Sequence, residues 1–129
     1  MICLDSDCII DFLRGRKEAI AIVEKHKEAV VTTEINVFEV FFGLYADKKA
    51  RKNVEEKTEL FFDTLQILQA GGWGKIAAET LAALIKKGET IEQNDCLIAA
   101  NMIANGCNKI ITRNKKHYSR IDGIEVIPY

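Results

Sequence analysis

The chain has 129 residues, enough for one ordinary domain to bury a core without disulfides or a structural metal. Hydrophobic residues make up 48% of it and charged residues 29%, a composition that excludes an intrinsically disordered chain. The 18 basic and 19 acidic residues leave a net charge of −1, which offers no global attraction to nucleic acid. We therefore expect a single domain over residues 1–129, on which any contact with nucleic acid must be local.

The cysteines and the apolar runs indicate a cytoplasmic protein. The four cysteines form no CxxC pair, and three lie in apolar runs where a free thiol behaves as a small hydrophobic side chain. Such thiols persist in a reducing cytoplasm. No apolar run is long enough to cross a bilayer, and no basic segment precedes one at the N-terminus. We expect a protein that is neither secreted nor bound in a membrane.

Hydrophobic periodicity, caps and glycines predict a regular alternation of strands and helices. In chain order, the first expected elements are a strand over residues 2–4, a helix over 8–13 that ends at Gly15, a helix over 17–27 and a strand over 29–32. A helix over 35–46 follows, and a second helix leads from a charged stretch at 47–59 into 60–65. The remaining elements are a strand over 66–69, helices over 76–85 and 95–104, and strands over 109–112 and 124–127.

This order predicts an α/β fold with three layers, because parallel strands need helical crossovers that cover both faces of the sheet. The last strand is expected at an edge. In such sheets ligands bind beyond the carboxyl ends of the strands, so polar residues just after Leu4, Thr32 and Thr112 are the first candidates for a functional site.

Asp5 directly follows the first strand, where its carboxylate could project over the edge of the sheet. An Asp in this position can also serve only as a helix N-cap. Asp7 adjoins Cys8 and is the better-placed cap, which would leave Asp5 without a local structural role. We therefore favour a functional Asp5.

Glu39 lies in the middle of a helix so apolar that most of its circumference is expected to be buried. An unpaired carboxylate there is costly, so Glu39 needs a cation or a cleft. The alternatives are that it pairs with a Lys or Arg, or that its side of the helix is exposed.

Asp95 opens the sixth expected helix, where the helix dipole favours a negative charge even without a function. Three carboxylates at one sheet edge, Asp5, Glu39 and Asp95, would repel one another unless they were protonated or bridged by a cation. An all-oxygen set suits Mg²⁺, with Mn²⁺ as an alternative. Zinc is disfavoured because the two histidines, His26 and His117, have no ligand spacing.

Asn114 lies two residues beyond a strand and could orient a metal-bound water or close an Asx-turn; both interpretations stay open. Basic residues near the candidate site could hold phosphates, although a solvated surface is the simpler interpretation. The candidates for RNA contact are Arg14, Arg113, Lys115 and Lys116.

Short motifs recur along the chain in a distinctive order: Leu4-Asp5-Ser6-Asp7-Cys8-Ile9-Ile10-Asp11, Glu39 with Gly43-Leu44, Asp95-Cys96-Leu97-Ile98-Ala99-Ala100, Thr112-Arg113-Asn114, and Gly123-Ile124-Glu125-Val126-Ile127. As a set they resemble the VapC toxins of the PIN-domain family, over essentially the whole chain. The resemblance implies a compact PIN-like fold, a magnesium-dependent endoribonuclease acting on structured RNA, a homodimer, and neutralisation by a cognate antitoxin.

By motif, the resemblance makes Asp5, Glu39 and Asp95 the three acids and puts Asn114 in the fourth position. It implies that metal-bound water attacks a phosphodiester in line, with Asp5 and Asp95 binding the ion and Asn114 positioning the water shell around it. Glu39 would either bind the ion through water or help to deprotonate the attacking water. The chain departs from the family at two places: Asn114 stands where an Asp is frequent, and His117 where many relatives have another Asp. Metal affinity or activity is expected to be reduced.

The aromatic side chains offer a second kind of surface. Phe38, Phe41, Phe42, Phe61 and Phe62 could form core or an apolar groove for an antitoxin helix, and we expect most of them in the core.

Two other functions compete with a nuclease. Asp5-x-Asp7 is similar to the aspartyl-nucleophile phosphatases of the haloacid dehalogenase group, in which Asp5 would attack phosphate, but 129 residues leave little room for their other motifs and cap. A response-regulator receiver is excluded because residues 66–69 supply no phosphoacceptor Asp. A PIN relative whose site has decayed at Asn114 and His117 would bind RNA or protein without cleaving.

Overall fold

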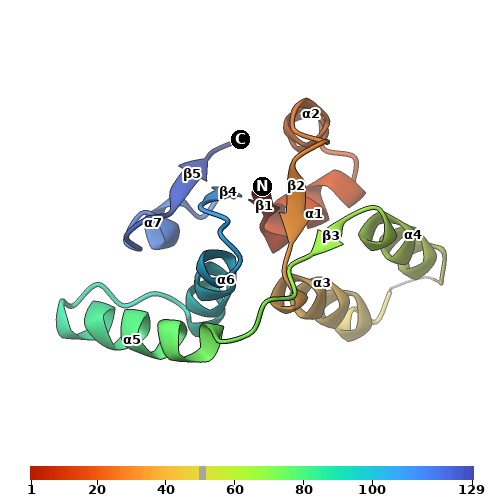
Figure 1. The fold of residues 1–129 in the computed structure, drawn as a ribbon. Helices are drawn as coiled ribbons and strands as arrows, with labels where there is room; N and C mark the ends of the chain where they lie inside the picture. The colour runs from red at the N-terminus through yellow and green to blue at the C-terminus, as the bar shows by residue number, and fades with distance from the viewer. Residues whose placement is uncertain (50–51) are drawn as a thin grey trace.

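The computed structural model describes residues 1–49 and 52–129, in which parallel strands alternate with helices (Figure 1). The strands are β1 (Ile2–Leu4), β2 (Val30–Thr32), β3 (Gln66–Ile67), β4 (Lys109–Ile111) and β5 (Glu125–Ile127). The helices are α1 (Ser6–Leu13), α2 (Lys17–Lys25), α3 (Glu34–Ala46), α4 (Lys52–Asp63), α5 (Trp73–Lys86), α6 (Gln93–Ala104) and α7 (Lys115–Tyr118).

The strands form one parallel sheet in the order β3-β2-β1-β4-β5, which confirms the α/β prediction and the edge position of the last strand. β1 lies at the centre, with Cys3 paired to both Val31 of β2 and Ile110 of β4. The chain winds outward from β1 through β2 to β3, and then continues on the other side of β1 with β4 and β5. The boundary between β1 and β4 is therefore the point where the strand order reverses.

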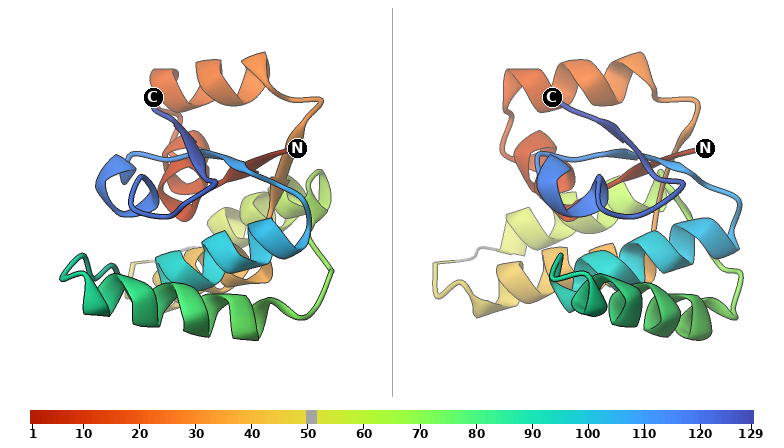
Figure 2. Two further views of the ribbon diagram at one scale, coloured as in Figure 1. Left: turned by 60° about the vertical axis from the view of Figure 1, so that its left-hand side comes forward. Right: turned by 90° about the vertical axis from the view of Figure 1, so that its left-hand side faces the viewer.

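The two faces of the sheet are covered by different helices, as Figure 2 shows. Side chains alternate along each strand, so Cys3 and Ile110 face a core built with α5 and α6. Leu4 and Ile111, one residue further on, face a second core that includes α1, α2 and parts of α3 and α4. The period of two along β1 and β4 thus produces the three layers.

The predicted elements differ from the observed ones mainly at their ends. α1 begins at Ser6 rather than Cys8, and α6 begins at Gln93 rather than Asp95. Gly15 follows the end of α1 with a φ of 78°, a conformation that glycine adopts without strain. The four-residue helix α7 was not predicted, because a single basic turn has no apolar period. Residues 50 and 51, in the charged stretch before α4, lie outside the described residues.

The exposure of α3 contradicts the expectation that most of its circumference is buried. Phe38 and Phe42 are 59% and 62% exposed, so these two of the five phenylalanines considered lie outside the core. Their rings stack on each other with centroids 5.7 Å apart. The helices α1, α4 and α6 pack against α3 but leave the positions of Phe38 and Phe42 uncovered. Phe62 is buried, and Phe41 and Phe61 pack at the margin of the second core.

Among the described helices, none has both the length and the apolar character to cross a lipid bilayer.

Candidate active site

A polar cavity of about 250 Å³ lies beyond the carboxyl ends of β1 and β4, at the point where the strand order reverses. Its lining comes from the β1–α1 junction, α3, α6 and the segment after β4, and consists of Asp5, Ser6, Asp7, Ile10, Glu39, Asp95 and Asn114. The four side chains predicted for catalysis, Asp5, Glu39, Asp95 and Asn114, thus share one cavity although 109 positions separate the first from the last.

Asp5 is the most enclosed of these carboxylates, at 5% exposure. It is the N-cap of α1, since Oδ1 accepts the Ser6 backbone N–H at 2.9 Å. Oδ1 also accepts from Asn36 Nδ2 at 3.1 Å, and Oδ2 accepts from the Thr112 hydroxyl at 2.7 Å. The expectation that Asp7 caps this helix in place of Asp5 is therefore wrong: Asp5 both caps the helix and lines the cavity.

Burial first, and then the neighbouring charge of Asp7, raise the pKa of Asp5 to about 7, although the hydrogen bonds from Thr112 and Ser6 lower it. The more distant charge of Asp95 also raises this pKa. Ionised Asp5 is therefore costly in the metal-free protein, and a cation in the cavity would relieve that cost.

Asp7 was interpreted only as a cap, but it belongs to the cavity. Its Oδ2 accepts the Arg113 backbone N–H at 3.0 Å, which ties α1 to the segment after β4. Within the described residues, its buried Oδ1 has no hydrogen-bond partner. Burial raises the pKa of Asp7, and the Arg113 and Cys8 N–H groups together with the Arg113 guanidinium offset part of this. A buried oxygen left without a donor is an unsatisfied acceptor.

Glu39 enters the cavity from α3 and is half-buried. Its Oε1 accepts the Ser6 hydroxyl at 2.7 Å, and its Oε2 has a long contact of 3.5 Å with Asn94 Nδ2. No Lys or Arg in the described part of the chain forms an ion pair with it, so the cleft interpretation fits and the ion-pair interpretation does not. Oε2 is the less firmly held oxygen of this carboxylate.

Asp95 lies in the first turn of α6 and meets two nitrogens from the segment after β4. Its Oδ2 accepts Asn114 Nδ2 at 2.8 Å and lies 2.6 Å from His117 Nδ1. His117 Nδ1 also lies 2.9 Å from Asn114 Nδ2, so the three side chains form one compact cluster. Asn114 does not close an Asx-turn: its backbone N–H donates to the Thr112 hydroxyl, and its side chain faces Asp95.

Tyr118 joins the two halves of the site. Its buried hydroxyl lies 3.2 Å from Asp5 Oδ1 and 3.4 Å from Asp95 Oδ1. Tyr118 was not among the predicted site residues, and His117 was predicted only as a departure from an Asp of the family. The signal was their position on one short turn, Lys115–Tyr118, directly after the strand that ends at the cavity.

Four basic residues were predicted to contact RNA, and they lie at different distances from the acids. Arg113 adjoins the cavity through its backbone bond to Asp7. Lys115 and Lys116 are exposed on α7. Arg14 instead lines a separate groove between α1, α3 and α4. No lysine or arginine lines the acidic cavity itself, as far as the structure describes the chain.

The family model of the PIN domain matches residues 2–124. The chain belongs to the PIN domain family. No curated protein matches it in sequence. Among solved structures, it is similar to VapBC2 from Rickettsia felis bound to a promoter DNA fragment, with 22% identity, a TM-score of 0.86, and coverage of 100% of this chain and 99% of that one.

Two further VapBC structures resemble this PIN domain. DNA-bound VapBC from Salmonella typhimurium has 21% identity and a TM-score of 0.84, with 98% of this chain and 96% of that one covered. VapBC-1 from nontypeable Haemophilus influenzae has 23% identity and a TM-score of 0.82, with 99% and 98% covered. At these identities the likeness establishes the fold, which is the predicted three-layer PIN fold.

The donor chemistry of this PIN domain suits a hard divalent cation. The carboxylate side chains of Asp5, Glu39 and Asp95 line one cavity, together with that of Asp7. The carboxylates are held apart by hydrogen-bond donors: among the described residues, no three His, Cys, Asp or Glu side chains stand close enough to enclose an ion. The donors fit Mg²⁺ in kind, although they are not gathered around one point.

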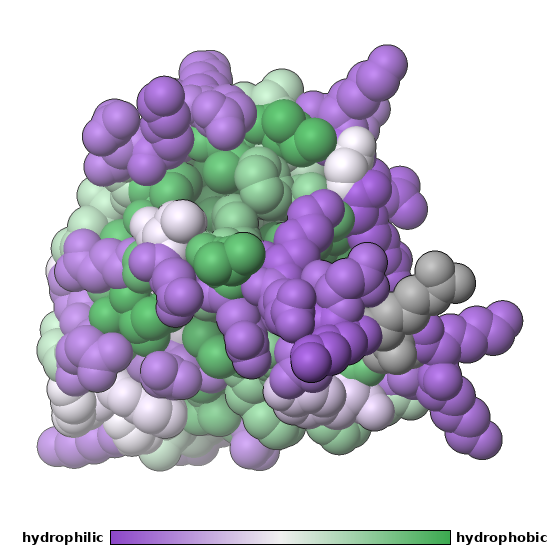
Figure 3. Space-filling view, turned by 90° about the vertical axis from the view of Figure 1, so that its right-hand side faces the viewer, coloured by the Kyte–Doolittle hydropathy of each residue, from purple (hydrophilic) through white to green (hydrophobic). Residues whose placement is uncertain are grey.

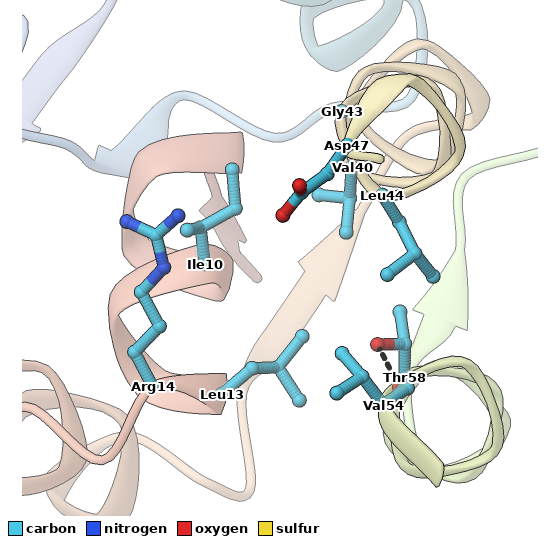
Figure 4. A pocket seen from close by; sticks show the side chains of 9 residues that line it. All are labelled: Ile10, Leu13, Arg14, Val40, Gly43, Leu44, Asp47, Val54 and Thr58. Atoms are coloured by element: carbon cyan, nitrogen blue, oxygen red, sulfur yellow. Dashed lines mark hydrogen bonds between the residues drawn. The ribbon is translucent and has the colours of Figure 1, made fainter. Parts of the chain in front are cut away.

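An apolar groove lies next to the acidic cavity. It has a volume of about 370 Å³ and lies between α1, α3 and α4, with Ile10 lining both hollows. In Figure 4, Ile10 and Leu13 of α1 face apolar side chains of α3 and α4 across it. Figure 3 shows the face that carries α4, where apolar residues lie exposed between hydrophilic ones. The groove could hold an apolar segment of another chain beside the carboxylates.

Proposed function

We propose that this PIN domain is a magnesium-dependent endoribonuclease, the toxin of a VapBC-type toxin–antitoxin pair, acting in the cytoplasm as one domain. One observation carries the proposal: Asp5, Glu39, Asp95 and Asn114, from four separate segments, line a single cavity at the reversal point of the sheet. Family membership and the similarity in fold to VapBC structures support it. Membership in the PIN family also leaves no place for the aspartyl-phosphatase alternative.

Asp5, Glu39 and Asp95 would hold Mg²⁺, or Mn²⁺ in its place. The ion would lower the pKa of a coordinated water and neutralise charge on the phosphate under attack. Glu39 would bind the ion through water or help to deprotonate the attacking water, and its Oε2, held only by the 3.5 Å contact to Asn94, is the more available oxygen for either role. Asn114 and Tyr118 orient Asp95 and Asp5 through their side-chain hydrogen bonds.

A cognate antitoxin is the proposed inhibitor, and an apolar segment of it would occupy the groove between α1, α3 and α4. Because Ile10 lines both the groove and the acidic cavity, an occupant there would lie beside the carboxylates.

The resemblance to VapC toxins also implies a homodimer. We propose that the second copy covers the exposed side of α3, where Phe38, Phe42 and Tyr45 are each more than half exposed.

The competing function is a binding module with a decayed site. The observation that favours it is the 2.6 Å contact between His117 Nδ1 and Asp95 Oδ2, because it engages an oxygen that a metal ion would need. Equilibrium dialysis against Mn²⁺ separates the two, with the Asp5→Asn, Asp95→Asn double variant as control. Binding that is lost in the double variant supports the nuclease, whereas equal and negligible binding by both proteins supports the decayed module.

The nuclease itself is tested with a labelled pool of structured RNA incubated with purified protein in Mg²⁺, Mn²⁺ or EDTA. We expect cleavage in either metal and intact RNA in EDTA. Intact RNA in both metals at high protein concentration would contradict the proposal.

A further inference from the structure

A second charged cluster, built around Asp11, lies next to the catalytic cavity. The Asp11 side chain is only 3% exposed, and its two oxygens are shared by three partners. Arg16 Nε lies 3.2 Å from Oδ1, and Arg113 Nε lies 3.1 Å from Oδ2. The Tyr129 hydroxyl donates to Oδ2 at 2.8 Å. One buried carboxylate on α1 thus links three other segments: the α1–α2 connection with Arg16, the segment after β4 with Arg113, and the last residues with Tyr129.

The cluster carries a net positive charge that faces solvent. Two guanidinium groups and one carboxylate sum to +1, and the Arg16 and Arg113 side chains are 57% and 53% exposed. Each guanidinium has five N–H donors in a planar fork and meets Asp11 through Nε, so donors remain for a ligand. A planar fork matches the oxygens of a phosphate group better than an ammonium does.

The cluster is close to the acids of the cavity. Asp11 follows Asp7 by four residues, one turn along the same face of α1. Arg113 donates its backbone N–H to Asp7 and follows Thr112, whose hydroxyl bonds to Asp5. The arginine pair therefore stands at the rim of a cavity whose own carboxylates repel a phosphate backbone, and it supplies positive charge where the cavity lacks it.

We propose that Arg16 and Arg113, aligned by Asp11 and Tyr129, bind a non-scissile phosphate of the RNA strand next to the cleavage site. The proposal rests on the proposed ribonuclease function and adds Arg16, Asp11 and Tyr129 to the residues that serve it. Arg16 and Arg113 contact the substrate, whereas Asp11 and Tyr129 are positioning residues that hold the two forks side by side.

The test measures binding of a fluorescein-labelled RNA hairpin in EDTA, across a salt series, for the wild type, Arg16→Gln, Arg16→Lys and Arg120→Gln. Arg120 is the matched control, because it loses the same charge at a site where its guanidinium donates to the Thr90 carbonyl. We expect Arg16→Gln to weaken binding about tenfold and to lower the salt slope by about 0.7 to 0.9. Arg16→Lys should keep the slope but regain only part of the affinity, because it keeps the charge and loses the fork.

Equal affinities for Arg16→Gln and Arg120→Gln would overturn the clamp, as would full recovery by Arg16→Lys. Circular dichroism and the urea midpoint of each variant exclude loss of folding as the cause. Cleavage in Mg²⁺ by the wild type, measured alongside, separates the two proposals: a wild type that cleaves while Arg16→Gln binds normally refutes the clamp alone. A wild type that neither binds nor cleaves refutes the ribonuclease function as well.

Discussion

His117 Nδ1 lies 2.6 Å from Asp95 Oδ2, so an imidazole stands against the third acid of the site. Asn114 Nδ2 contacts the same oxygen at 2.8 Å. Both nitrogens stabilise Asp95 when no metal is present, and both compete with a cation for this oxygen. This pair of residues therefore balances stability of the metal-free protein against metal affinity.

Replacing His117 with Asp should shift that balance. His117→Asp puts a second carboxylate against Asp95, which should destabilise the metal-free protein by about 1–3 kcal/mol and raise Mg²⁺ affinity about tenfold. Isothermal titration with Mg²⁺ and urea unfolding in EDTA measure the two effects. His117→Gln, which removes the imidazole without adding charge, is the control. Unchanged Mg²⁺ affinity in His117→Asp would show that position 117 does not reach the ion.

Stability of the metal-free protein should fall as the pH rises from about 4 to 7. The folded-state pKa of Asp5 is raised to about 7, above its ordinary value of 3.8, chiefly by burial. Between those values the folded state binds more protons than the unfolded chain, so raising the pH removes stability, by at most about 4 kcal/mol. Urea unfolding in EDTA at pH 5 and pH 8 measures the loss, and Asp5→Asn should show a smaller one. Parallel pH curves for the two proteins would refute the assignment to Asp5.

Asp5→Asn should abolish cleavage while leaving the metal-free protein at least as stable at pH 8. The substitution removes a buried charge, and the Thr112 hydroxyl can still donate to Asp7 Oδ2, 3.3 Å away, while it accepts from the new amide. Thermal unfolding in EDTA and RNA cleavage in Mg²⁺ test both parts. Clear destabilisation at pH 8 would indicate that the carboxylate is structural rather than a metal ligand.

Phe42→Asp should convert the proposed homodimer to a monomer without unfolding it. Phe42 is already 62% exposed, so the folded monomer loses little buried area, whereas a charge on the exposed side of α3 opposes association. Sedimentation equilibrium measures the mass. Leu60→Asp is the control, because Leu60 is 67% exposed on the neighbouring helix α4. A monomeric wild type, or equal dissociation by Leu60→Asp, would contradict an interface on α3.

Much of the fold was predictable because its signals are local. The short apolar runs 2–4, 29–32 and 109–112, separated by helical periods, specify parallel strands with crossovers, and the polar residues that follow them mark the functional edge. The same reasoning brought Asp5 and Asn114 to one place without knowledge of any contact, whereas Asp95, which follows no strand, was assigned to the site by the family resemblance.

The errors arose where tertiary contacts decide the outcome. By sequence Asp7 is the better-placed cap, but Asp5 and Asp7 are held by the Thr112 hydroxyl and the Arg113 N–H, more than a hundred residues away. The exposed side of α3 is as apolar as its buried side, so composition could not reveal which helices cover it. The Asp11 cluster joins the two ends of the chain, a relationship that no local pattern contains.

The central claim is tested most directly by single-turnover cleavage of a labelled structured RNA in Mg²⁺ and in EDTA, using the wild type, Asp95→Asn and Asp63→Asn. Asp63 is exposed at the end of α4, so it supplies the same charge change outside the cavity. We predict metal-dependent cleavage that falls about 100-fold or more in Asp95→Asn and is retained in Asp63→Asn. Cleavage that continues in EDTA, or an Asp95→Asn variant as active as the wild type, would contradict a metal-dependent nuclease at this site.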